Sequence, residues 1–180
     1  MDVLSSSYDD DKIAWYENNG AVDPSFTAHT ITTSADQANG GRSVYAVDVD
    51  GDGDMDVLST SQGDDKITWY ENNGSESFTA HTISSSADGA VSVYALDVDG
   101  DGDMDVLSAS TGDDKIAWHE NNGSESFTTH NITTSAGEPY SVYAIDLDRD
   151  GDIDVLSAGD DGKIEWYENN GSQSFTTHTI

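Results

Sequence analysis

The chain has 180 residues and a formal charge of −30, because 36 acidic residues stand against only six lysines and arginines. Such a surface repels phosphate backbones and anionic lipid headgroups, which argues against nucleic-acid binding and membrane-surface binding. Cysteine is absent, which excludes disulfide bonds and thiolate metal sites, and no apolar run approaches the ~18 residues that span a bilayer.

One unit is written four times along the chain. Its most recognisable segment is KIAWYENNG at residues 12–20, which recurs with small changes in each of the other three repeats. The tryptophans of the four copies are Trp15, Trp69, Trp118 and Trp166. Insertions near 21–24 and 36–41 lengthen the first spacing. The predicted repeats of this single repeat domain, 1–180, are 1–42, 43–91, 92–140 and 141–180. Repetition with aromatic and β-branched residues in a regular pattern indicates a folded array rather than disorder.

In chain order, the first repeat opens on MDVLS at residues 1–5 and continues with KIAWYEN and FTAHTI. The second repeat contains a complete set of predicted strands, at 43–49, 55–61, 66–72 and 77–83. Alternation such as Ile67 and Trp69 against Thr68 and Tyr70 is typical of strands, and the Asn-Gly pairs predict tight hairpins. The expected fold is therefore all-β, a β-propeller of four-stranded antiparallel blades.

The chain begins inside the acidic loop of its first repeat, so the first blade is expected to lack its leading strand. Two interpretations stay open. The chain is a piece of a longer array, or another copy completes its open strand edges.

An acidic loop follows the first strand of the last three repeats. In DVDGDGDMD, residues 48–56, carboxylates occupy alternate positions, Gly53 allows a sharp turn, and position 7 offers its backbone carbonyl. Hard oxygen ligands at this spacing are those that Ca²⁺ requires, whereas Mg²⁺ takes fewer protein ligands. The alternative is a solvated acidic turn, but three copies with fixed spacing favour about three calcium sites. Their candidate residues are Asp48, Asp50, Asp52, Asp54 and Asp56; Asp97, Asp99, Asp101, Asp103 and Asp105; and Asp146, Asp148, Asp150, Asp152 and Asp154.

These loops and the strand after each of them, as in DVDGDGDMDVLSAS at 97–110, resemble the FG-GAP/VCBS repeats of integrin α-subunit propellers and many bacterial surface proteins. The resemblance covers essentially the whole chain. It implies a propeller with calcium at the outer loops and roles in adhesion, ligand recognition or assembly. The namesake Phe-Gly and Gly-Ala-Pro pairs are absent, so the likeness is to the bacterial VCBS-like branch.

Other recurring residues each allow a structural interpretation. The histidines of the last strands, His29, His81, His130 and His178, are expected to pack or to form a surface ladder. Tyr16, Tyr70 and Tyr167 are either core residues or aromatic platforms for a sugar, since some related propellers are lectins. Asn73, Asn122, Asn131 and Asn170 match the glycosylation acceptor pattern, and three of them lie in the Asn-Gly turns.

Catalysis has little support, because the paired carboxylates are committed to the loops and no nucleophile arrangement is present. The sequence thus predicts a non-enzymatic calcium-binding module for adhesion or recognition of a glycan or protein ligand. The alternative is a structural subunit of an extracellular fibre or surface array, assembled with copies of itself through open strand edges. Calcium sites of extracellular type bind at roughly 0.1–1 mM, and cytosolic calcium is too scarce to fill them, so the expected location is extracellular or at the cell surface.

Overall fold

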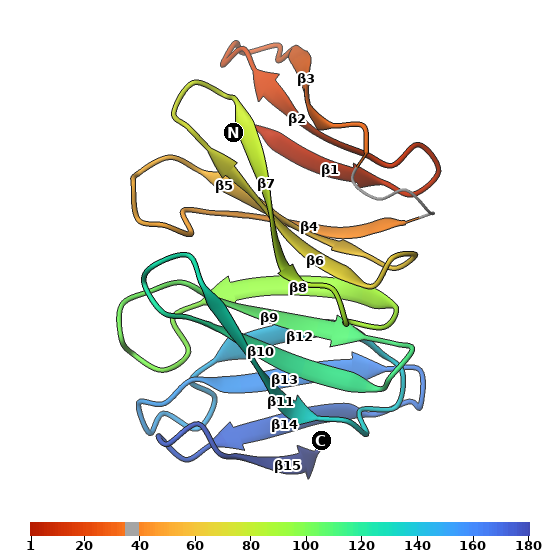
Figure 1. Ribbon diagram of the computed structural model, residues 1–180, viewed down its shortest axis with the longest axis vertical. Coiled ribbons are helices and arrows are strands. Elements are labelled where there is room, and N and C mark those ends of the chain that lie inside the picture. Colours follow the sequence, from red (N-terminus) through yellow and green to blue (C-terminus); the bar gives the residue numbers. More distant parts are fainter. Residues whose placement is uncertain (35–39) are drawn as a thin grey trace.

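The computed structural model describes residues 1–34 and 40–180, which form 15 strands in four antiparallel sheets (Figure 1). The first sheet comprises β1 (Val3–Ser7), β2 (Lys12–Asn18) and β3 (Phe26–Thr32). The second comprises β4 (Gly41–Val47), β5 (Asp56–Ser61), β6 (Lys66–Asn72) and β7 (Phe78–Ser84). The third comprises β8 (Ala90–Leu96), β9 (Asp105–Ser110), β10 (Lys115–Asn121) and β11 (Phe127–Thr133). The fourth comprises β12 (Pro139–Ile145), β13 (Asp154–Gly159), β14 (Ile164–Asn169) and β15 (Phe175–Thr179). Of the insertion predicted at 36–41, residues 36–39 lie outside the described residues.

Each sheet is a meander in which every strand pairs with the next one along the chain. Short connections impose this order, because antiparallel neighbours need only a turn between them. The register is the same from sheet to sheet: Leu58 lies opposite Trp69, and Trp69 lies opposite His81. The prediction of an all-β chain of four-stranded antiparallel units is confirmed, with three strands in the first sheet. The arrangement of these sheets as propeller blades stays a prediction.

The four sheets follow one another along the long axis of the molecule, from the N-terminal sheet at one end to the C-terminal sheet at the other (Figure 1). The first strands β4, β8 and β12 contact one another, and the Val93 N–H donates to Ser43 Oγ across two sheets at 3.4 Å. Along the same strands the rings of Tyr45, Tyr94 and Tyr143 lie in a row, with centroids 5.0 and 4.8 Å apart. These strands therefore join the sheets into one stack.

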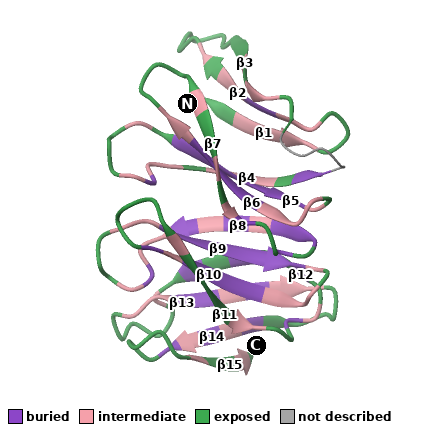
Figure 2. Ribbon diagram, viewed as in Figure 1, coloured by how far each residue is buried: buried purple, intermediate pink, exposed green. Residues whose placement is uncertain are grey.

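The hydrophobic core lies between consecutive sheets. Because side chains alternate along a strand, Ile67 and Trp69 pack into the core shared with the third sheet, while Val57 and Tyr70 pack toward the first sheet. Both faces of an inner sheet are thus covered. Figure 2 shows the result, with buried residues concentrated in β5, β6, β8, β9 and β10 and far fewer in β1, β3 and β15. No helix that could cross a membrane occurs among the described residues.

The contact between the first two sheets is incomplete. A cavity of about 300 Å³ lies there, lined by residues that include Leu4, Trp15 and Phe78. Between the second and third sheets, Val49 is buried in the core and Val47 packs against it. The three described strands of the first sheet do not supply counterparts of these two side chains.

The predicted tight hairpin at Asn73-Gly74 is wrong. Strand β6 ends at Asn72 and β7 begins at Phe78, so the connection holds five residues, 73–77. The Asn73 side chain accepts the N–H of Ser75 at 3.0 Å, and the Asn73 N–H donates to the Ser77 carbonyl at 3.2 Å. These bonds stabilise a wider turn than the two-residue hairpin that an Asn-Gly pair favours.

Candidate metal centres

Three acidic loops join the first and second strands of the last three sheets. In the loop between β4 and β5, Gly51 and Gly53 have φ angles of +76° and +96°, a left-handed backbone in which glycine is not strained. The third loop has Arg149 in the position of Gly51, with φ of +68°. A left-handed conformation costs an ordinary residue roughly 1–2 kcal/mol, so the third loop is the most strained of the three.

Hydrogen bonds to the backbone fold each loop around its carboxylates. The Asp48 carboxylate accepts the N–H groups of Gly51 at 2.8 Å and Gly53 at 3.0 Å, and Asp50 accepts the N–H of Asp52 at 3.1 Å. The Asp54 N–H donates to Asp52 at 2.8 Å. The other two loops repeat all four bonds. These bonds to the backbone hold the acidic side chains in place within each loop.

The last aspartate of each loop is completely buried. Asp105 accepts the N–H of Val98 at 3.0 Å and that of Asn121 at 2.8 Å. Burial raises the pKa of Asp105 to about 6, against the lowering effect of these two N–H groups and of the Trp118 indole. Asp56 and Asp154 are buried with the same pattern of backbone bonds. One carboxylate therefore ties the loop to the third strand of its sheet.

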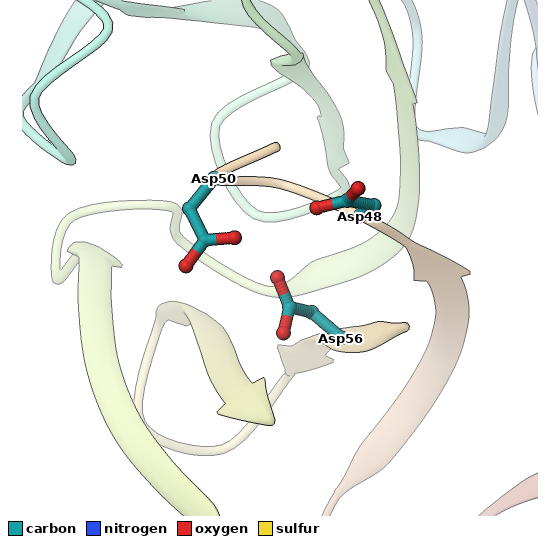
Figure 3. A group of neighbouring side chains, drawn as sticks. All are labelled: Asp48, Asp50 and Asp56. Atoms are coloured by element: carbon teal, nitrogen blue, oxygen red, sulfur yellow. The ribbon is translucent and has the colours of Figure 1, made fainter. Parts of the chain in front are cut away.

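Carboxylate oxygens converge within each loop, as Figure 3 shows for Asp48, Asp50 and Asp56. In this group every pair of candidate ligand atoms lies within 4.8 Å. Ca²⁺ binds oxygen at 2.3–2.6 Å, so ligands on opposite sides of one ion are roughly 4.6–5.2 Å apart. The residues present therefore fit a calcium ion. The corresponding groups in the other loops are Asp97, Asp99 and Asp101, and Asp146, Asp148 and Asp154.

Desolvation and repulsion between like charges both raise the pKa of aspartates in the acidic loops. Burial, and then the charges of the neighbouring carboxylates, raise the pKa of Asp50 and of Asp99. A carboxylate from the third strand, Glu71, contributes to the rise at Asp50 and Glu120 contributes at Asp99. The fold thus keeps several mutually repelling carboxylates close together, and a cation bound among them would favour their charged form.

Not all the predicted ligands join these groups. Asp52, Asp105 and Asp150 lie outside the three convergent sets, so the second loop differs from the others in using Asp101 in place of its last aspartate. The position-7 side chains Asp54, Asp103 and Asp152 lie against Gly74, Gly123 and Gly171 of the turn before the last strand, where a Cβ on Gly74 would meet Asp54 Oδ2 at 2.5 Å. Position 7 thus uses its side chain to contact this turn, which leaves its backbone carbonyl for the predicted ligand role.

Asparagines at the ends of the third strands also bind the acidic loops, and they were not identified from the sequence. Asn72 donates its backbone N–H to Asp56 at 2.7 Å and its side-chain amide to the Met55 carbonyl at 3.1 Å. Asn121 and Asn169 do the same in the next two sheets. The signal available in the sequence is the Glu-Asn pair that precedes Asn-Gly in every repeat.

The recurring histidines form a repeated surface arrangement with tryptophan and glutamate. His81 stacks on Trp69 with ring centroids 4.7 Å apart, and its Nε2 lies 2.7 Å from Glu71 Oε2. The same stack and pair recur at His29, His130 and His178. This ladder covers the buried tryptophan from solvent and agrees with the structural interpretation of these histidines.

The remaining candidate residues lie in two environments. Tyr70 and Tyr167 are 4% and 0% exposed, so neither ring offers a face to a ligand, while Tyr16 is half-buried. The glycosylation candidates Asn73, Asn122, Asn131 and Asn170 are exposed. The first, second and fourth of them lie in turns, and Asn131 lies on β11.

Comparison with known proteins gives one family and a set of related structures. The FG-GAP-like repeat matches residues 1–59, 48–108, 97–157 and 146–180, which together cover the whole chain. No curated protein matches significantly, whereas 37 chains of solved structures do. One is an Agrocybe aegerita lectin, whose structure concerns specific recognition of non-reducing terminal N-acetylglucosamine. It is 19% identical with a TM-score of 0.61, and the match covers 99% of this chain and 52% of the lectin chain. The fold is shared, and this chain spans about half the length of the lectin.

Proposed function

The chain belongs to the FG-GAP-like repeat family, and we propose that it is a calcium-binding β-propeller module that recognises a glycan or protein ligand outside the cell and catalyses no reaction. The convergence of carboxylate oxygens in three equivalent loops is the observation that carries this proposal. The sheets act as a scaffold that holds the loops on short connections between paired strands.

Each loop contributes to ion binding in two ways. Its first and second aspartates, Asp48 and Asp50 in the first loop, direct oxygens inward while accepting backbone N–H groups, and its last aspartate is buried and fixed to the third strand. A bound calcium ion would offset the repulsion between these negatively charged carboxylates. Calcium is favoured over magnesium because the donors are several carboxylates on one loop, whereas magnesium requires near-ideal octahedral geometry and retains water.

The net charge of the chain supports an extracellular location. A formal charge of −30 makes the ion-free chain self-repulsive, and ions at millimolar concentration are available outside the cell to offset it. The ligand assignment rests on the family and on the fold shared with a lectin. Terminal N-acetylglucosamine is therefore the first ligand to test on this chain.

Thermal unfolding with calcium and with chelator tests the metal assignment. At a free calcium concentration ten times the dissociation constant, each site stabilises the folded state by about 1.4 kcal/mol, so three sites give about 4 kcal/mol. For a chain of this size that corresponds to a rise in Tm of roughly 8–16 °C. Magnesium at the same concentration is expected to give a clearly smaller shift.

A matched pair of variants separates ion binding from general charge. The triple substitution Asp48→Asn, Asp97→Asn and Asp146→Asn is expected to abolish most of the calcium response. The control, Asp9→Asn, Asp10→Asn and Asp23→Asn, removes the same number of charges from exposed positions outside the loops and is expected to retain the response. An equal Tm for the parent chain in calcium and in chelator would refute the metal assignment. Absence of calcium-dependent binding to immobilised terminal N-acetylglucosamine would remove that glycan while leaving the metal result intact.

A further inference from the structure

A row of tyrosines crosses the junctions between the second, third and fourth sheets. Tyr45, Tyr94 and Tyr143 occupy the same position of strands β4, β8 and β12, each opposite a leucine of the next strand in its sheet. Because these first strands contact one another, the ring of each tyrosine meets the ring of its counterpart in the next sheet. The ring centroids are 5.0 Å apart for Tyr45 and Tyr94 and 4.8 Å apart for Tyr94 and Tyr143.

The hydroxyl groups of this tyrosine row interact as well as its rings. Burial, and then hydrogen bonding to Tyr143 and Tyr45 together with their charges, raise the pKa of Tyr94 to about 12. The middle hydroxyl therefore keeps its proton at physiological pH, next to phenol oxygens that are able to accept it. None of the three residues is fully buried, so the row can be reached from solvent.

The other five tyrosines of the chain differ from the row. Tyr70 and Tyr167 are 4% and 0% exposed, which shields them from a reagent in solution. Tyr8, Tyr16 and Tyr140 are more accessible. Among the accessible tyrosines of the described residues, however, the close ring pairs are the two within the row. The row therefore combines accessibility with a neighbouring phenol ring.

From this arrangement we infer that Tyr94 is a site of oxidative cross-linking to Tyr45 or Tyr143, through a dityrosine bond that joins neighbouring sheets covalently. The oxidant is hydrogen peroxide acting through a peroxidase. Each tyrosine of a pair loses one electron and its phenolic proton, and the two radicals couple through ring carbons next to the hydroxyl groups. The hydrogens on these two carbons then move to the oxygens and restore two phenols. The pair loses two hydrogen atoms in total, which convert one hydrogen peroxide into two molecules of water.

The fold favours coupling within the row. Two rings about 5 Å apart in one folded chain react at a far higher effective concentration than tyrosines of separate molecules. The paired rings are inclined at 52° and 46°, so ring edges, where the coupling carbons lie, turn toward the neighbouring ring. A bond between Tyr45 and Tyr94 closes a loop of about 50 residues and restricts the unfolded chain. The linked chain should therefore unfold at a higher temperature.

The experiment treats the whole chain, at low micromolar concentration and in chelator, with a haem peroxidase and limiting hydrogen peroxide. At an ionic strength of about 0.01 M the Debye length is roughly 30 Å, so copies with a charge of −30 repel one another and links between copies are disfavoured. The product is expected to have the mass of a monomer less two hydrogen atoms and the fluorescence of dityrosine. Its Tm should exceed that of the untreated chain by roughly 8–16 °C.

Peptide mapping and phenylalanine variants locate the bond. Cleavage at acidic residues places the three tyrosines of the row in different peptides, so a linked pair that contains Tyr94 identifies the site. Tyr94→Phe keeps the ring, removes the hydroxyl that oxidation requires, and is expected to abolish the linked monomer. Tyr45→Phe and Tyr143→Phe each keep one pair and should still form it. The matched control Tyr140→Phe removes an exposed tyrosine outside the row and should link as the parent chain does.

Three outcomes would overturn the inference. One is a parent chain without dityrosine in its monomer, in a reaction that does couple free tyrosine. The second is a Tyr94→Phe variant that circular dichroism shows to be folded and that forms as much linked monomer as the parent chain. The third is a linked chain with an unchanged Tm, which would mean that the bond does not hold the sheets together.

Discussion

His119 makes the third sheet acid-sensitive in a way that the other sheets are not. It stands where the second and fourth sheets have Tyr70 and Tyr167, and it is 1% exposed. Its Nε2 lies 3.0 Å from Ser108 Oγ, and its Nδ1 lies 2.9 Å from Thr129 Oγ1. Burial, with smaller effects from the charges of Lys115 and His130, lowers the pKa of His119 to about 4. The imidazole is therefore neutral in the folded chain at every pH above about 4.

The sign of the effect follows from proton linkage. An unfolded chain binds a proton at this histidine near pH 6.5, whereas the folded chain does so only near pH 4. Stability is therefore fully present above about pH 6.5 and falls as the pH is lowered toward 4. The whole shift corresponds to roughly 3 kcal/mol, and about 2 kcal/mol of it is lost between pH 7.5 and pH 5.

Replacing His119→Tyr removes this titration and restores the residue found in the other sheets. Urea unfolding at pH 7.5 and pH 5 in chelator measures the difference between the two proteins. With a urea m value of about 2 kcal/mol/M, the midpoint of the parent chain should fall by roughly 1 M more than that of the variant. Asp105 acts in the opposite direction, because its raised pKa means that stability is lost as the pH rises through about 6. It is common to both proteins and cancels in the comparison.

The reciprocal variant, Tyr70→His, provides the matched test. Tyr70 is 4% exposed in the second sheet, so the introduced histidine is expected to add a second acid-sensitive position. The same pH dependence in the parent chain, His119→Tyr and Tyr70→His would refute the assignment of acid sensitivity to a buried neutral imidazole.

Two further pairs of substitutions test the loop geometry. Gly74→Ala is expected to cost roughly 2–3 kcal/mol in urea unfolding, because Gly74 has φ of +74° and its Cβ would meet the Asp54 carboxylate. Gly51→Ala, at φ of +76° in open space, should cost only about 1 kcal/mol, and equal costs would show that the Asp54 contact is unimportant. Arg149→Gly should raise the calcium affinity of the third loop several-fold in calorimetry, because it removes both an arginine with a left-handed backbone and a positive charge. The reverse substitution Gly51→Arg should lower the calcium affinity of the first loop. Unchanged affinities in both variants would contradict this reasoning.

The strands and the acidic loops could be predicted from the sequence because both depend on local patterns. Alternation of apolar and polar residues defines a strand regardless of its partners, and calcium ligands on one loop have a fixed spacing. Repetition strengthened both signals, since one pattern appears up to four times. The convergence of Asp48, Asp50 and Asp56 depends on the loop itself and on one residue of the strand that follows.

Contacts that depend on the pairing of distant segments could not be predicted. Asn72 binds Asp56 across 16 residues, and this bond requires the register of β5 against β6. The environment of Tyr70 was equally open in the sequence, because both faces of an inner sheet are covered and alternation does not distinguish a buried face from an exposed one. The turn at 73–77 was mispredicted because the hydrogen bonds of Asn73 to Ser75 and Ser77 stabilise a five-residue connection in place of a two-residue one.

The buried aspartate connects the acidic loop to the core of its sheet. Asp105 is held by the loop through Val98 and by the third strand through Asn121, and Val98 is itself part of the core between the third and fourth sheets. Displacement of this carboxylate would therefore move a core residue at a junction between sheets. In a stack where each unit contacts only its neighbours, stability is set by such junctions. If the loop at 97–105 binds calcium as proposed, removal of the ion should disturb Asp105 through its loop and weaken the junction between the third and fourth sheets before the others.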